Sequence, residues 1–176
     1  MRIIAGVLSG RNFDSPKTHR THPMSDKVRG ALFNALGDLQ GLTVLDAYAG
    51  SGACSLEAVS RGAAAVLAID VDTEAVKTIA ENVKSLNLTD VVTVRRKNIS
   101  GWSRNNQNTQ FDIVLADPPY DDIRPDVLER LTLHVKPGGL FVLSWPGSEP
   151  VRDFAHFAVV SHKTYGDAQL VFYRRS

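Results

Sequence analysis

Short apolar runs alternate with helical patterns along this chain, and that alternation limits its fold more than any other feature. The apolar runs have no polar face, which is typical of strands buried on both sides of a sheet. Between them, apolar residues recur three and four positions apart, which predicts amphipathic helices. The expected strands lie at 42–45, 64–69, 91–94, 111–116 and 140–144, and the expected helices at 25–36, 53–61, 73–86 and 125–134. This order predicts an α/β fold, a mostly parallel sheet with helices on both faces.

We expect residues 1–24 to form a basic extension ahead of the main domain. Segments 2–8 and 11–14 look extended on either side of Ser9-Gly10, as in a short β-hairpin. The first 30 residues carry six Lys or Arg against two Asp, a net charge of +4 in a chain whose total is +1. Such an arm suits nucleic-acid phosphates, although a solvated extension is the alternative. The candidate RNA ligands are Arg11, Arg20, His22 and Arg29.

We expect residues 25–176 to form one domain, whose last two strands, near 157–163 and 168–174, form a hairpin. A chain of 176 residues can bury a full core without disulfides or metals. Its single cysteine, Cys54, excludes an internal disulfide and a multi-cysteine zinc site, which suits a reducing compartment. Neither a signal peptide nor a run of eighteen apolar residues occurs. We therefore expect a cytoplasmic monomer with no membrane segment.

The motif Asp46-Ala47-Tyr48-Ala49-Gly50-Ser51-Gly52 joins the first core strand to a helix. Ligands of open α/β sheets bind at this end of the strands. Glycines let the backbone approach a ligand, and the first amides of a helix favour a negative group. Asp70 ends the second strand about 20 residues later, where an acid binds ribose hydroxyls. The pattern predicts an adenosine cofactor, and a tight turn with Asp70 as a helix cap is the alternative.

Two adenosine cofactors fit this pattern, and the chain favours S-adenosylmethionine over a nicotinamide dinucleotide. Ser55 stands where a dinucleotide fingerprint has Gly or Ala. The methionine carboxylate suits the helix start, and its ammonium group suits Asp46. Asn98, after the third strand, either hydrogen-bonds the adenine or caps the next helix. The predicted cofactor ligands are Asp46, Tyr48, Gly50, Ser51, Gly52, Asp70, Asn98 and Asp117.

The motif Asp117-Pro118-Pro119-Tyr120 follows strand 111–116 and fits methyl transfer to an amine. Transfer from a sulfonium moves positive charge onto the amine nitrogen. Asp117 and the Pro118 carbonyl, in a turn that proline keeps rigid, can accept both amine hydrogens and oppose that charge. Tyr120 can stack a flat base, and its ring face is expected to matter more than its hydroxyl. We predict Asp117, Pro118, Pro119 and Tyr120 as catalytic, with no metal; a plain rigid turn is the alternative.

These motifs resemble those of the small single-domain bacterial 16S ribosomal RNA (guanine-N2)-methyltransferases. The likeness extends from Arg2-Ile3-Ile4-Ala5-Gly6 to Tyr165-Gly166. The resemblance implies a Rossmann-like class I methyltransferase fold with a seven-stranded, mostly parallel sheet. It also implies S-adenosylmethionine as donor, S-adenosylhomocysteine as product, and a guanine amine in 16S ribosomal RNA, or in the assembling small subunit, as acceptor.

The most specific part of the resemblance is His22-Pro23-Met24-Ser25-Asp26-Lys27-Val28-Arg29-Gly30-Ala31-Leu32-Phe33-Asn34. It is similar to the family pattern Arg-Pro-Thr-(Ser/Thr)-Asp-x-x-Arg-Glu-x-Leu-Phe-Asn. The chain departs from that pattern at His22, Met24 and Gly30. If these positions touch cofactor or RNA, affinity or nucleotide choice differs here.

Other functions share parts of this pattern. DNA adenine-N6 methyltransferases also use Asp-Pro-Pro-Tyr, but about thirty residues before the core leave little room for sequence recognition. A protein-amine methyltransferase would not need a basic arm, and Ser55 disfavours a nicotinamide-dependent oxidoreductase. A non-catalytic nucleic-acid-binding module would not need Asp70 and Asp117 at strand ends. We therefore predict ribosomal RNA methylation.

Overall fold

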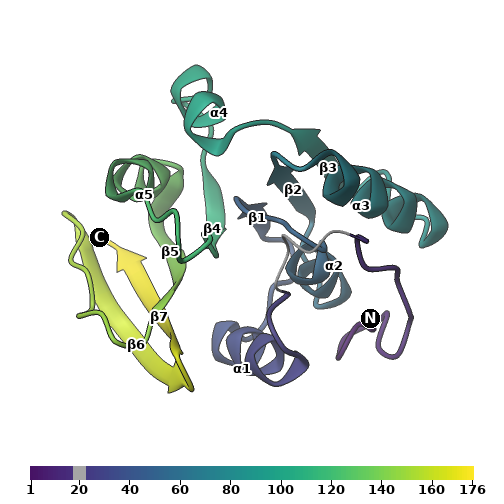
Figure 1. Ribbon diagram of the computed structural model, residues 1–176, viewed down its shortest axis with the longest axis horizontal. Coiled ribbons are helices and arrows are strands. Elements are labelled where there is room, and N and C mark those ends of the chain that lie inside the picture. Colours follow the sequence, from purple (N-terminus) through teal and green to yellow (C-terminus); the bar gives the residue numbers. More distant parts are fainter. Residues whose placement is uncertain (18–22) are drawn as a thin grey trace.

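In the computed structural model, which describes residues 1–17 and 23–176, a seven-stranded sheet separates two layers of helices (Figure 1). The strand order is β3-β2-β1-β4-β5-β7-β6. Strands β1 to β5 are parallel, and β7 runs antiparallel to both β5 and β6. The strands are β1 Thr43–Asp46, β2 Ala65–Asp70, β3 Val92–Arg96, β4 Phe111–Ala116, β5 Val135–Pro146, β6 Phe157–Tyr165 and β7 Ala168–Arg175. This confirms the expected mostly parallel, Rossmann-like α/β sheet.

Five helices in the described part of the chain cover the sheet, and each face has its own apolar core. Helices α1, α2 and α3 bury the first core, and α4 and α5 bury the second on the opposite face (Figure 1). Strand alternation divides the apolar residues, so that Val44 joins the first core and Leu45 the second. No helix among the described residues is long and apolar enough to cross a membrane. The helices are α1 Asp26–Leu36, α2 Ala53–Ser60, α3 Thr73–Ser85, α4 Ile99–Asn105 and α5 Pro125–Thr132.

Local capping explains where most helices begin and end. Helix α1 starts after Ser25, whose hydroxyl accepts the Val28 N–H at 3.3 Å, and it stops at Gly37, where φ is 78°. These bounds are as predicted. Helix α4 is the short helix that the capping alternative for Asn98 implies, but the sequence gives no bounds for it, because residues 103–110 look like a polar loop. A helix this short and polar is not stable by itself, and the packing of Trp102 in the second core stabilises it.

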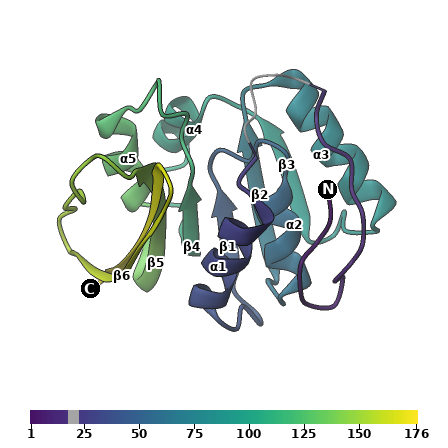
Figure 2. The same cartoon turned by 60° about the horizontal axis from the view of Figure 1, so that its bottom comes forward.

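The two arms of the N-terminal segment pair as an irregular hairpin. They share one antiparallel bridge, between Arg2 and Asn12, and further backbone hydrogen bonds join residue 3 to residues 10 and 11 and residue 1 to residue 13. Other backbone groups bond to α2 instead. Two N–H groups donate to the carboxylate of Glu57, at 2.8 and 3.1 Å, and a third donates to the carbonyl of Ser60 at 2.8 Å. The segment therefore runs along α2 and α3 as part of the first core (Figure 2).

Strand β5 is longer than predicted, whereas the closing hairpin of β6 and β7 is confirmed. The turn expected at residues 136–139 is a bulge inside β5. Phe111 of β4 pairs with Val135, and Ile113, two residues later, pairs with Leu140, five residues later in β5. Gly139 permits the bulge, since a Cβ there would lie 2.6 Å from the carbonyl oxygen of Asp112.

The strand order also locates a binding crevice. From β1 the chain moves outward through β2 to β3, then returns to the other side of β1 with β4 and β5. The order reverses between β1 and β4. In open α/β sheets the crevice lies at such a reversal, beyond the carboxyl ends of the strands.

Candidate active site

Three aspartates predicted for the site meet at the carboxyl edge of the sheet. Asp46 and Asp70 end the neighbouring parallel strands β1 and β2, and Asp117 follows β4 on the other side of β1. Their charges act on one another, since Asp117 and Asp70 both raise the pKa of Asp46. The structure therefore brings the two predicted motifs together at the reversal point.

Asp46 is almost fully buried, with 4% of its surface exposed, below the start of α2. The hydroxyl of Ser55, in the first turn of α2, donates to its carboxylate at 2.6 Å. Burial raises the pKa of Asp46 to about 7; the Ser55 hydrogen bond opposes this rise, and the charges of Asp117 and Asp70 add to it. Ser55, a mismatch to a dinucleotide fingerprint, is thus the partner of Asp46. A cation placed here would favour the ionised carboxylate.

Residues 46–52 form a turn, called here the glycine turn, which Asp70 holds against β2. One carboxylate oxygen of Asp70 accepts the Gly50 N–H at 2.8 Å, and the other accepts the Asp72 N–H at 2.9 Å. Gly52 has φ 78°, and a Cβ there would lie 2.9 Å from Cγ1 of Ile79. Gly52 also offers no side chain to cap α2. The turn therefore places beside an acid a helix start that has no N-cap side chain, and its Ala53 N–H donates only a long bond, 3.4 Å, to the Ser51 hydroxyl.

The other predicted cofactor ligands differ in their settings. Asn98 caps α4 and is exposed, and its side-chain oxygen accepts the Gly101 N–H at 3.2 Å. Capping was the alternative for this residue, so its contact with adenine stays a prediction. Tyr48 is half-buried, and burial, with the charge of Asp122 adding to it, raises its pKa to about 12. Ser51 is buried within the glycine turn.

The Asp-Pro-Pro-Tyr turn has one buried end and one open end. Burial raises the pKa of Asp117, and a hydrogen bond from Ser144 opposes that rise. Pro118 is buried, whereas Tyr120 keeps 40% of its surface exposed. The Tyr120 hydroxyl lies 2.8 Å from Oγ of Ser144 and 3.2 Å from the carbonyl oxygen of Trp145. The hydroxyl, to which the sequence gives less weight than the ring face, is therefore what fixes the ring.

Arg29 does not lie on a surface that RNA can reach. Its side chain has 0% exposure and donates to the Arg2 carbonyl at 2.8 Å and to Asp26 at 3.0 Å, with Glu57 at 3.8 Å. This burial contradicts the prediction that Arg29 contacts phosphates. The prediction failed because the sequence shows the basic residue but not the partners that it meets inside the fold. Arg11 is exposed. Arg20 and His22 lie outside the described residues.

The departures from the family pattern lie in different settings. Met24 packs partly buried against the first core. Gly30 faces the N-terminal segment, and a Cβ there would lie 3.8 Å from Cδ1 of Ile4. Position 22 belongs to the part of the chain that is not described.

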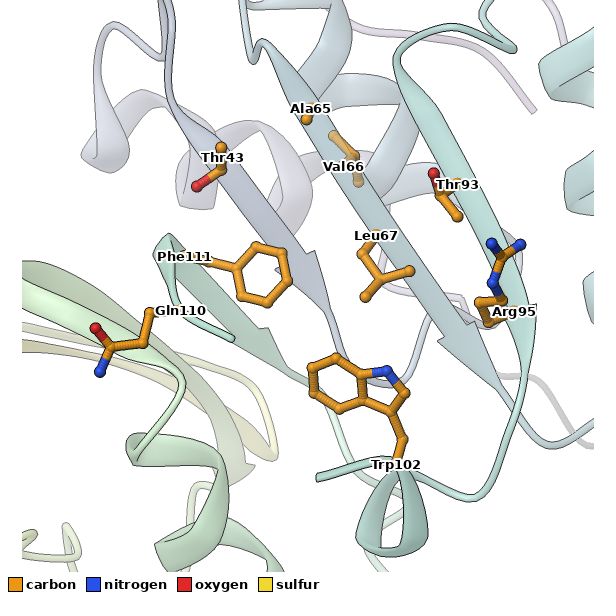
Figure 3. A pocket seen from close by; sticks show the side chains of 9 residues that line it. All are labelled: Thr43, Ala65, Val66, Leu67, Thr93, Arg95, Trp102, Gln110 and Phe111. Carbon is orange, nitrogen blue, oxygen red and sulfur yellow. The ribbon is translucent and has the colours of Figure 1, made fainter. Parts of the chain in front are cut away.

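A hollow of about 380 Å³ on the α4 side of the sheet is separate from this edge. Trp102 and Phe111 pack together on one side of it, and Arg95 lies on the other (Figure 3). It opens near the amino ends of β1 and β2, and none of the three site aspartates lines it. Within residues 1–17 and 23–176, no group of three or more His, Cys, Asp or Glu side chains is placed to hold a metal ion. The absence of a metal stays a prediction.

Known proteins are similar to this chain in sequence and in fold. The family described as "Conserved hypothetical protein 95" matches residues 1–174. The chain belongs to this family. Over 125 residues it is 34% identical to the "Putative rRNA methyltransferase YlbH" of Bacillus subtilis, covering 69% of this chain and 68% of that protein. Over 121 residues it is 34% identical to "Ribosomal RNA small subunit methyltransferase D" of Escherichia coli K12, covering 68% of this chain and 60% of the relative.

A solved structure extends the likeness to the whole chain. The "Putative methyltransferase yhhF from Escherichia coli" superposes with a TM-score of 0.89 at 27% identity and covers 100% of this chain and 98% of that one. The resemblance to the 16S ribosomal RNA methyltransferases and the class I methyltransferase fold are thereby confirmed.

Proposed function

We propose that this protein transfers a methyl group from S-adenosylmethionine to the exocyclic N2 amine of a guanine in 16S ribosomal RNA. One observation carries the proposal: Asp117, with Tyr120 in the same turn, lies close enough to Asp46 of the glycine turn for their charges to interact, at the point where the strand order reverses. An amine acceptor and a methyl donor bound there would be neighbours. The small-subunit ribosomal RNA methyltransferases among its relatives support the substrate class.

The residues at the edge fit this cofactor. The uncapped start of α2 suits the methionine carboxylate, and Asp46 suits the ammonium group. The Asp70 carboxylate accepts two backbone N–H groups and keeps lone pairs free for the ribose hydroxyls. When bound, S-adenosylmethionine supplies an electrophilic methyl group.

Asp117 and the Pro118 carbonyl orient the acceptor. Together they accept the two N–H groups of the amine, which directs the nitrogen lone pair at the methyl group. As the N–C bond forms, the nitrogen gains positive charge, and the Asp117 carboxylate opposes it. One amine proton then leaves to water or to Asp117. The exposed ring of Tyr120 stacks on the base. An adenine N6 amine is the alternative acceptor, since the same turn serves any planar amine.

The test is methylation of unmodified 16S ribosomal RNA, naked and within assembling small subunits, followed by mass spectrometry of the nucleosides. We expect N2-methylguanosine. Asp117→Ala should lower kcat about a hundredfold or more with little change in KM, the usual loss of about 2.7 to 4 kcal/mol for one preorganised contact. Asp121→Ala, at an exposed acid in the same loop, is the matched control and should stay active. N6-methyladenosine, or unimpaired turnover by Asp117→Ala, would contradict the proposal.

A further inference from the structure

Ser144 lies on β5 directly beside the Asp-Pro-Pro-Tyr turn. Leu143 pairs with Ala116 in the β4–β5 register, so the next residues of the two strands, Ser144 and Asp117, are neighbours. Ser144 is a polar residue in an apolar strand and has only 6% of its surface exposed. A buried hydroxyl in such a strand needs hydrogen-bond partners.

Alternation places Ser144 and Asp117 on the same face of the sheet. Val142 belongs to the first core and Leu143 to the second, so Ser144 points to the side of the first core. Ala116 belongs to the second core, so Asp117 points to the same side as Ser144. Asp46 shares that side, as its contact with Ser55 of α2 shows. Ser144 is thus on the reacting side of the edge.

The hydroxyl groups at this point allow two patterns of hydrogen bonding. A serine or tyrosine hydroxyl donates one proton and accepts others. If Tyr120 donates to the Trp145 carbonyl, Ser144 can donate to Tyr120, and Asp117 receives nothing from it. If Tyr120 donates to Ser144, the Ser144 proton is free for Asp117. The second pattern forms a continuous chain from the stacking ring to the reacting carboxylate.

We propose, resting on the proposed function, that Ser144 is a positioning residue whose hydroxyl links Tyr120 to Asp117 and so fixes the base platform and the amine acceptor together. Ser144 acts through those two residues and touches neither RNA nor cofactor. Burial raises the pKa of Asp117, and donation from the Ser144 hydroxyl would oppose that rise. The other groups that face Asp117 are Asp46 on β1, Cys54 on α2 and Tyr120 in the turn.

The first measurement is independent of methylation. Proton titration of carbon-13-labelled aspartate carboxyls by NMR should show the Asp117 midpoint at higher pH in Ser144→Ala than in the unchanged protein, because the ionised form loses a donor. Tyr120→Phe should not raise that midpoint, since Ser144 then donates freely to Asp117. Ser148→Ala, at an exposed serine beyond the same strand, is the control. Alanine can destabilise a strand, so a second pair of variants is needed. Ser144→Thr and Ser144→Val have similar shapes, and only the threonine keeps the hydroxyl.

Kinetics then test the positioning role. Ser144→Ala and Ser144→Val should lower kcat about tenfold, the loss expected for a hydrogen bond to a charged group. They should also move the acid limb of the rate profile to higher pH, while Ser144→Thr restores both. An unshifted Asp117 midpoint, or equal behaviour of the threonine and valine variants, would overturn the inference. A shifted midpoint in a protein that makes no methylguanosine would support the Ser144 link and refute the proposed function instead.

Discussion

Asp46 shows how one buried carboxyl links stability to ligand binding. Its pKa is about 7 in the folded chain, against 3.8 for an ordinary aspartate. The folded state therefore holds this proton more tightly than the unfolded state does. As the pH rises above 3.8, the pKa in the unfolded chain, the free energy of unfolding falls. The fall ends at about pH 7, where the carboxyl of the folded chain ionises as well. The cost is recovered when a cation binds beside the carboxylate.

We expect Asp46→Asn to stabilise the unliganded protein at pH 8, by on the order of 4 kcal/mol at most, because the amide never has to ionise. The gain should shrink toward pH 4. The same change should weaken S-adenosylmethionine binding, since its ammonium group loses a charged partner. Urea unfolding at several pH values and calorimetry measure the two effects. Asp38→Asn, at an exposed position, is the control, and equal responses of the two variants would argue against this account.

At the scale of elements, α2 joins the candidate site to the N-terminal segment. Its first turn carries Ser55, which holds Asp46. Two and five residues later, Glu57 and Ser60 accept backbone N–H groups of the N-terminal segment. Glu57 has 0% exposure and is also the counter-charge of Arg29 and Arg61. One short helix thus holds both the Asp46 carboxylate of the candidate site and the backbone of the N-terminal segment.

Glu57→Gln should destabilise the fold by about 3 to 5 kcal/mol, because it leaves the buried Arg29 charge poorly compensated. Two nitrogens of Arg29, Nε and Nη1, already lack a hydrogen-bond partner, so the side chain relies on nearby negative charge. Glu129→Gln removes an exposed ion pair with Arg152 and should cost under about 1 kcal/mol. Urea unfolding of both variants gives the comparison. Similar losses would mean that the buried network contributes no more than a surface pair.

For the whole molecule, the distribution of charge differs from what the sequence suggests. The first 30 residues carry +4, but Arg29 is buried and is balanced by Asp26 and Glu57. Arg11, in contrast, is exposed on the N-terminal segment. The positive surface offered by this part of the chain is therefore smaller than the count of basic residues implies.

Arg11→Ala should weaken RNA binding at every sequence and reduce the slope of log affinity against log salt by about 1, the value for one phosphate contact. S-adenosylmethionine affinity should not change. Arg174→Ala, at an exposed arginine of β7, is the control. Fluorescence anisotropy with labelled 16S fragments over a salt series measures the slopes. A slope identical to that of the unchanged protein would assign Arg11 to a solvated surface.

Much of the fold could be predicted because its causes are local. The bounds of α1 follow from the Ser25 cap and Gly37, and β4 coincides with the predicted strand 111–116. The candidate site could be predicted in outline, since parallel strands bring their carboxyl ends, and hence Asp46, Asp70 and Asp117, to one edge whatever the details of packing. Periodicity and topology are properties that a linear sequence carries.

The tertiary structure alone decided which distant groups meet. The backbone of residues 4 and 5 bonds to Glu57, more than fifty residues away, instead of to a hairpin partner. The Tyr120 hydroxyl meets Ser144 on another strand, and the Arg29 charge turns inward. Each of these outcomes depends on the free energy of satisfying buried polar groups, which is set by what the packed chain places within about 3 Å of them. No local pattern encodes that distance.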